Sequence, residues 1–172
     1  MRQKSNSKRR FQLKAMGIAS LVIAVDEGTK AFIRQHLLMC SDRSVGVCDH
    51  LNVVGSLKLV HTENAGSAFG FLQGWGIWIA VAALGFLLVF VYSRYLRQTG
   101  WLAALAVGLQ AGGALGNLLD RLVAGHVTDW IYVGSPVIFN LADVALALGM
   151  LFALRALLVH DRTASLQGLP SE

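Results

Sequence analysis

Long apolar stretches separated by short polar segments dominate the chain. On a window of about 19 residues, four of these stretches are long enough to cross a bilayer as helices, because about 20 apolar residues span its hydrocarbon core. They cover residues 11–33, 75–92, 101–119 and 136–159. The pattern therefore predicts an all-α membrane protein with four transmembrane helices.

The first apolar stretch is the least regular of the four. Its uninterrupted core, from Ala15 to Val25, is short for a span and is followed directly by Asp26 and Glu27. A basic start before a short apolar core is also typical of a signal peptide. We favour a span, because no small-x-small cleavage site precedes the carboxylates and the sequence resumes as AFI after Lys30.

The segment between the first two stretches, about residues 34–73, is expected to lie outside the membrane. It contains two strand-like runs, residues 51–54 and 56–62, and the second alternates apolar and polar residues. We therefore expect a small extracytoplasmic β-sheet between helices 1 and 2. Cys40 and Cys48 fall in the same segment, where an oxidising compartment favours a disulfide. A metal site or a catalytic thiol would need a third ligand or a C-x-x-C spacing, which this segment lacks.

Composition and charge support a membrane location. Of the 172 residues, 55% are hydrophobic and 15% charged, with a mean hydropathy of +0.55, which predicts a single membrane-embedded domain over residues 1–172. The net charge of +5 could indicate a nucleic-acid partner. However, ten of the fifteen Lys and Arg residues fall in the N-terminal tail, between the second and third stretches, or at the C-terminal end. The positive-inside rule then places both termini in the cytoplasm, so the basic tail indicates topology and contact with membrane lipid rather than nucleic acid.

Carboxylates within apolar stretches are costly and are candidates for function. Because successive spans alternate in direction, the carboxylates in and beside them all fall toward the outer leaflet: Asp26, Asp120, Asp129 and Asp143. Asp143 lies in an apolar sequence and needs a polar partner, and Asn140, three residues earlier, shares its helix face. Asp120 and Arg121 can instead reach water from a helix end. If Asp120 only reaches water in this way, we expect Asp120→Asn to retain appreciable activity.

A pair of aspartates would suit peptide hydrolysis. Two carboxyl groups at low dielectric keep one proton between them, so one can activate water while the other polarises the scissile carbonyl. The partners open to Asp143 are Asp129, Asn117 and Arg121. Other chemistries lack support, because the five histidines are scattered without H-E-x-x-H, Ser67 lies outside any nucleophile-elbow pattern, and the sequence shows no phosphate-binding glycine motif.

Glycines recur through the third stretch. Gly108, Gly112 and Gly116 are spaced four apart, with Gly113 beside them. Small residues at this spacing let helices approach closely in lipid. We expect them to bring the third helix close to the fourth and so to fix the polar cluster.

Four sequence blocks, taken together, define a family resemblance. They are DEGTK at residues 26–30, NAGSAFG at 64–70, GGALGNLLDRL with VTDW at 112–122 and 127–130, and FNLAD at 139–143. Their order and content resemble those of the lipoprotein signal peptidase family, also called signal peptidase II, the intramembrane aspartic proteases of bacteria. The resemblance covers about residues 14–158.

This resemblance implies cleavage of a prolipoprotein signal peptide immediately before a cysteine that carries a diacylglyceryl group. It implies Asp129 and Asp143 as the catalytic dyad, with a supporting and substrate-binding set: Asp26, Lys30, Asn64, Gly66, Asn117, Arg121 and Asn140. It also implies a site at the outer leaflet of the bacterial inner membrane, inhibition by globomycin-type cyclic peptides, and neither a metal nor an organic cofactor.

Three features depart from the family pattern, and two other functions stay open. Glu27 replaces the usual Gln, the 13 residues between Asp129 and Asp143 look short, and the pair of cysteines is unusual for the family. A small proton-coupled carrier would use the aspartates as a relay, but it needs a polar path through the cytoplasmic half as well. The other alternative is a non-catalytic relative that binds lipopeptides. The intact FNLAD and VTDW blocks argue against it.

Overall fold

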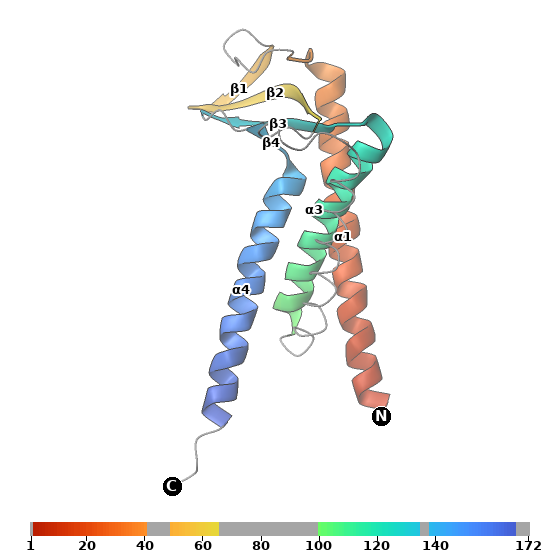
Figure 1. Cartoon of the computed structure of the whole chain (residues 1–172), viewed down its shortest axis with the longest axis vertical. Coiled ribbons are helices and arrows are strands. Elements are labelled where there is room, and N and C mark those ends of the chain that lie inside the picture. The colour runs from red at the N-terminus through yellow and green to blue at the C-terminus, as the bar shows by residue number, and fades with distance from the viewer. Residues whose placement is uncertain (1, 41–48, 66–99, 135–137, 168–172) are drawn as a thin grey trace.

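The computed structural model describes residues 2–40, 49–65, 100–134 and 138–167. Its helices are α1 (Arg2–His36), α3 (Trp101–Ala124) and α4 (Leu141–Gln167). Its strands are β1 (His50–Val54), β2 (Leu57–Asn64), β3 (Val127–Val133) and β4 (Ile138–Phe139), which form one antiparallel sheet in the order β1-β2-β3-β4. The sheet lies at one end of the helices, and the start of α1 and the end of α4 lie at the other (Figure 1).

The predicted helices agree with the structure in type and differ in their bounds. The expected spans 11–33 and 101–119 lie within α1 and α3, whereas α4 begins at Leu141 rather than at residue 136. The difference arises because residues 138–139 pair with β3. Residues 75–92 lie outside the described residues, so a bundle of four membrane helices stays a prediction. Among the described helices, α3 is long and apolar enough to cross a membrane.

The sheet is larger than the sequence predicted. The two expected strands are confirmed as β1 and β2, joined by a tight turn in which Gly55 has a φ of 55°. The expectation that the sheet comes from the segment between helices 1 and 2 is incomplete, because β3 and β4 come from the connection between α3 and α4. Strand β3 reads VTDWIYV, which is rich in β-branched and aromatic residues but lacks the alternation of a surface strand.

A β-bulge lies beside Asp129. In the register between β2 and β3, Val60 and His61 together oppose Trp130, and Thr62 then pairs with Asp129. Bulges redirect side chains and are common next to active sites. The Thr62 hydroxyl donates a hydrogen bond of 3.0 Å to the backbone oxygen of Asp129. Strand β2 therefore holds the main chain of Asp129 in place.

Small residues line the contacts between the helices, and large apolar residues face outward. The buried alanines are Ala15, Ala19, Ala103, Ala104, Ala106, Ala142, Ala145, Ala153 and Ala156. The exposed large residues include Leu13, Met16 and Leu21 on α1, Leu122 and Val123 on α3, and Met150, Leu151 and Leu154 on α4. Such a surface is unfavourable in water, whereas in lipid the close packing of small residues holds helices together. The helices therefore present a surface suited to lipid.

Glycines let α3 approach both neighbouring helices. A Cβ added to Gly108 would lie 2.6 Å from a side chain of α1, and one added to Gly112 would lie 2.7 Å from another. A Cβ on Gly113 would collide with the backbone oxygen of Ala142 in α4. Close packing at these glycines is confirmed, but Gly108 and Gly112 face α1, and Gly113 is the residue that brings α3 close to α4.

Cys40 lies just beyond the end of α1 and is disulfide-bonded. Cys48, the other cysteine of the chain, lies outside the described residues, so the pairing of Cys40 with Cys48 stays a prediction. The Cys40 N–H also donates a hydrogen bond of 2.8 Å to the His61 backbone oxygen. This bond ties the end of α1 to β2.

Substitution of Gly113 tests the packing of α3 on α4. Gly113→Ala should lower the free energy of unfolding by about 1–3 kcal/mol, the usual cost of overpacking, because the new methyl group meets the α4 backbone. Gly17→Ala is the matched control, since a Cβ there meets nothing within 4 Å and alanine favours a helix. Thermal unfolding in lipid nanodiscs measures both variants. Equal melting temperatures would contradict the close approach.

Candidate active site

Polar side chains from all three described helices and from the sheet meet where the helices reach the sheet. One connected set of hydrogen bonds and ion pairs links seven residues that the sequence singled out: Asp26, Lys30, Asn64, Asn117, Asp129, Asn140 and Asp143. Arg121 joins this set by donating to the Asn117 backbone oxygen over 3.1 Å. Gly66 lies outside the described residues.

Asn140 and Asp143 cap the N-terminus of α4. The Asn140 Oδ1 accepts the Asp143 N–H at 3.0 Å, and the Asp143 Oδ2 accepts the Asn140 N–H at 3.2 Å. This reciprocal pair has the geometry of a capping box, with Asn and Asp in place of the usual Ser or Thr and Glu. The carboxylate of Asp143 is therefore held by the helix end, where the helix dipole favours negative charge.

The same contacts orient the Asn140 amide. Because its oxygen accepts the Asp143 N–H, its nitrogen faces Asp129 and donates to Oδ1 over 2.8 Å. The other carboxylate oxygen of Asp129 accepts a hydrogen bond of 3.0 Å from the Asn64 Nδ2. Each oxygen of Asp129 thus has an amide donor, and one side chain, Asn140, links the two aspartates.

A buried lysine orients the second amide. The Lys30 side chain is fully buried, and its Nζ lies 3.2 Å from the Asn117 Oδ1. An ammonium group only donates, so the amide oxygen of Asn117 faces Lys30 and the amide nitrogen faces away. That nitrogen donates to the Asp143 Oδ1 at 2.8 Å. The position of the Asp143 carboxylate therefore depends on Lys30 through Asn117.

Two carboxylates balance the charge of Lys30. Its Nζ lies 2.6 Å from Asp26 and 2.9 Å from Asp120. Arg34 adds a second cation, 3.2 Å from Asp120. Buried charges are tolerated when they are paired and hydrogen-bonded. Asp26 also accepts the Ala142 N–H at 2.9 Å, so the cluster ties α1 to the first turn of α4.

Asp120 belongs to this cluster. Its exposed fraction is 4%, and it pairs with Lys30 and Arg34 while accepting the Thr128 N–H at 3.1 Å. The interpretation in which Asp120 reaches water from the helix end is therefore wrong, because the start of β3 folds over that end. Asp120→Asn would remove a partner of the buried Lys30. The expectation that this substitution retains appreciable activity therefore has no structural basis.

Three polar residues of the cluster were not predicted: Arg34, Thr62 and Thr128. A signal for Arg34 was present, since Asp26, Lys30 and Arg34 are spaced four apart and share one helix face. Thr128 accepts a hydrogen bond of 2.8 Å from the Arg34 Nη1, so it also connects the sheet to α1. The two threonines gave no signal, because their positions depend on the bulge and on the pairing of β3.

Burial raises the pKa of Asp129 to about 6. Hydrogen bonds from Asn64 and Asn140 oppose this rise, and the negative charge of Asp143 adds to it. A carboxyl group with this pKa can hold or release a proton near neutral pH, which suits acid–base catalysis. Within the described parts of the chain, no cluster of three His, Cys, Asp or Glu side chains is placed to hold a metal ion.

A buried carboxyl group, Asp129, beside a half-buried one, Asp143, at the end of lipid-facing helices is typical of a membrane enzyme. The sequence pattern of the family described as signal peptidase (SPase) II matches residues 18–159. The chain therefore belongs to the signal peptidase II family. It is a membrane protease that removes signal peptides.

Several relatives carry the name lipoprotein signal peptidase. The one from Xanthomonas oryzae pv. oryzae is 40% identical over 142 residues, covering 77% of this chain and 81% of the relative. Those from Burkholderia ambifaria and Syntrophomonas wolfei are 39% and 34% identical, and cover 89% and 83% of this chain and 89% and 91% of their own. A bacterial membrane enzyme solved by the in meso method at 1.9 Å has a TM-score of 0.63 and 26% identity, covering 84% of this chain and 92% of its own. Another, at 2.3 Å, has a TM-score of 0.64 and 25% identity, covering 92% and 94%.

The raised pKa of Asp129 predicts a pH-dependent effect of Asp129→Asn on stability. The folded carboxyl group titrates at about 6 and the unfolded one near 3.8, so its contribution to stability is fully present below pH 3.8 and is lost as the pH rises through 6. Relative to wild type, the variant should therefore gain stability between pH 4 and pH 7, by up to about 3 kcal/mol. Thermal unfolding at both pH values measures this gain. A difference that stays constant with pH would contradict the raised pKa.

Proposed function

We propose that the chain hydrolyses the peptide bond before the lipidated cysteine of diacylglyceryl-modified prolipoproteins, with Asp129 and Asp143 as the acid–base pair. One observation carries this proposal. The Asn140 side chain donates to the Asp129 carboxylate and the Asn140 backbone N–H donates to the Asp143 carboxylate, so a single residue helps to position both carboxyl groups.

In this proposal Asp129 holds the shared proton and Asp143 is ionised. Burial raises the pKa of Asp129 to about 6 despite two amide donors, so a minority of molecules carry a proton on Asp129 at pH 7, and in this proposal these are the reactive ones. Asp143 accepts one N–H from Asn117 and one from the Asn140 backbone, and it lies in the first turn of α4. Those donors and the helix end all favour a negative charge.

Hydrolysis then proceeds by proton exchange with a water molecule. Asp143 takes a proton from the water molecule while the water oxygen attacks the scissile carbonyl carbon. Asp129 gives its proton to the carbonyl oxygen. The tetrahedral diol collapses when the proton on Asp143 moves to the departing cysteine nitrogen and a diol proton returns to Asp129. The C–N bond breaks, leaving a carboxyl group on the signal peptide and a free amine on the lipidated cysteine. The aspartates again share one proton.

The surrounding polar residues have different parts in this proposal. Asp26, Lys30 and Asn117 position the dyad from the buried side, since their contacts lead to Asp143 and to the first turn of α4. Asn64 and Arg121 are only partly buried, and we assign them to substrate positioning. Gly66 is assigned to the same role from the sequence resemblance.

The proposed location is the bacterial inner membrane, with four spans, both termini in the cytoplasm and the site at the outer leaflet. The distribution of Lys and Arg supports this orientation. The start of α1 and the end of α4 also lie at the same end of the molecule, opposite the sheet (Figure 1). A peptide anchored by a diacylglyceryl group in the outer leaflet would reach carboxylates at this depth. Globomycin-type peptides are the expected inhibitors.

A carrier is not favoured as the alternative function. The family of the chain is one of proteases, and the relatives are named lipoprotein signal peptidases. A non-catalytic lipopeptide-binding protein is not favoured either, because both aspartates of the proposed dyad are present and connected through Asn140.

Amide substitutions test the dyad. Asp129→Asn and Asp143→Asn should each slow single-turnover cleavage of a diacylglyceryl-modified prolipoprotein by about 10³-fold or more, because an amide cannot exchange the proton. Both variants should stay folded, since the substitution keeps the shape of the side chain. Gel mobility of the released signal peptide, with and without globomycin, measures the cut.

Asp49→Asn is the matched control. Asp49 is an exposed aspartate directly before β1, and its carboxylate accepts only a long backbone hydrogen bond of 3.3 Å from Leu38 among the contacts described. This variant should cleave at the wild-type rate. Near wild-type cleavage by a folded Asp143→Asn variant would refute the dyad.

A further inference from the structure

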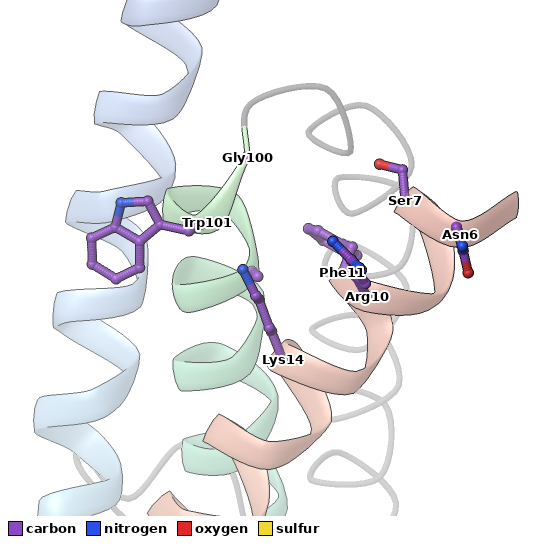
Figure 2. A pocket seen from close by; sticks show the side chains of 8 residues that line it. Asn6, Ser7, Arg10, Phe11, Lys14, Gly100 and Trp101 are labelled. Atoms are coloured by element: carbon purple, nitrogen blue, oxygen red, sulfur yellow. The ribbon is translucent and has the colours of Figure 1, made fainter. Parts of the chain in front are cut away.

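A second candidate site lies at the other end of the helices. A pocket of about 450 Å³ opens between the N-terminal part of α1 and the first turn of α3 (Figure 2). Lys14 lines it, twelve residues before Asp26, so the pocket is about 18 Å along α1 from the nearest residue of the catalytic cluster. The pocket is therefore separate from the proposed active site.

Two cations on one helix face line this pocket. Arg10 and Lys14 are four residues apart on α1, and both side chains reach toward the first turn of α3 (Figure 2). Among the described residues, neither has a carboxylate partner. Residues 2–14 contain six basic residues and no acidic one. The pocket thus has uncompensated positive charge and favours an anion.

The start of α3 adds donors to the same wall. Gly100 is the N-cap of α3, its cap makes no side-chain hydrogen bond, and the first turn contains no acidic residue. Ser7 and Asn6 complete the polar rim. The unpaired N–H groups at a helix start and the positive end of the helix dipole both strengthen binding of an anion that the two cations attract.

The other side of the pocket is apolar. Ala104 is buried and Phe11 is half-buried, where it packs against the cluster of Ala103 and Ala156. Trp101 lies at the edge of the pocket with 65% of its surface exposed, and its indole extends to the α4 side of α3 (Figure 2). Tryptophan at the end of a membrane span is typical of the headgroup level. A free inorganic anion would make no use of this apolar wall, whereas a lipid would.

We infer that this pocket binds an anionic phospholipid, with Arg10 and Lys14 on the phosphate group, Phe11 against the glycerol and the upper acyl chain, and Trp101 at the edge of the pocket. Under the topology proposed above, the lipid belongs to the cytoplasmic leaflet, whose anionic headgroups attract basic residues next to a span. Binding does not depend on the aspartate dyad, so the lipid site and the proposed catalysis can each fail without the other.

Quenching of Trp101 by brominated lipid tests this inference. The full chain is placed in phosphatidylcholine nanodiscs that contain increasing fractions of brominated phosphatidylglycerol, and the quenching lost in Trp101→Phe isolates the signal of this residue. We expect half-quenching at a much lower fraction of brominated phosphatidylglycerol than of brominated phosphatidylcholine. Equal quenching by the two lipids would overturn the inference.

A matched pair of double variants separates a site from diffuse attraction. Arg10→Gln with Lys14→Gln removes two charges from the pocket, and Lys8→Gln with Arg9→Gln removes two from the same helix outside the pocket lining. The fraction of phosphatidylglycerol at half-quenching should rise about tenfold in the first and less than about twofold in the second. Equal shifts in the two variants would overturn the inference.

Inorganic phosphate separates a lipid site from a free-anion site. Its addition at millimolar concentration should leave the quenching by brominated phosphatidylglycerol unchanged, and displacement of the lipid would mean that the pocket takes free phosphate instead. Cleavage of prolipoprotein in phosphatidylcholine nanodiscs checks folding, because these surface positions lie outside the catalytic cluster. Lys14→Gln alone is a second test with a smaller change. It should raise the fraction of phosphatidylglycerol at half-quenching about threefold.

Discussion

The buried ammonium group of Lys30 is the constraint on which the arrangement of the helices near the sheet depends. A lone charge at this depth is very costly, and the cost is offset only by partners held within hydrogen-bond distance. Asp26 supplies one partner from α1, and Asp120 and Asn117 supply two from α3. Glycines along α3 allow these helices to come close enough for the contacts to form.

The same charge gives the site its rigidity. Lys30 can only donate, so it fixes which end of the Asn117 amide faces Asp143, just as the Asp143 N–H fixes the Asn140 amide toward Asp129. Both carboxyl groups are thereby aimed by donors that cannot rotate freely. The proposed catalysis by a shared proton requires such fixed geometry, because small displacements of the reacting groups greatly reduce the rate.

Much of this arrangement could be predicted from the sequence, and the rest depends on tertiary contacts. Apolar length predicted α1, α3 and α4, strand-like composition predicted β1, and alternation predicted β2. The cost of carboxylates in lipid predicted a polar cluster. The burial of Asp120 was not predictable, because it depends on β3 folding back over the end of α3 to supply the Thr128 N–H. Strand β3 was missed because its sequence, VTDWIYV, lacks the apolar–polar alternation by which surface strands are found.

The coupling of Lys30 to the dyad through Asn117 is tested most directly by a double-mutant cycle on the single-turnover cleavage rate. Lys30→Met leaves Asp120 paired with Arg34 and Asp26 bonded to the Ala142 N–H, but it removes the cation beside the buried Asp26. Thermal unfolding in nanodiscs therefore accompanies each rate, and only folded variants are compared. We expect Lys30→Met and Asn117→Leu each to slow cleavage by about 10- to 100-fold, and the double variant to be no slower than the slower single variant. Multiplying effects in the double variant would show that Lys30 does not act through Asn117.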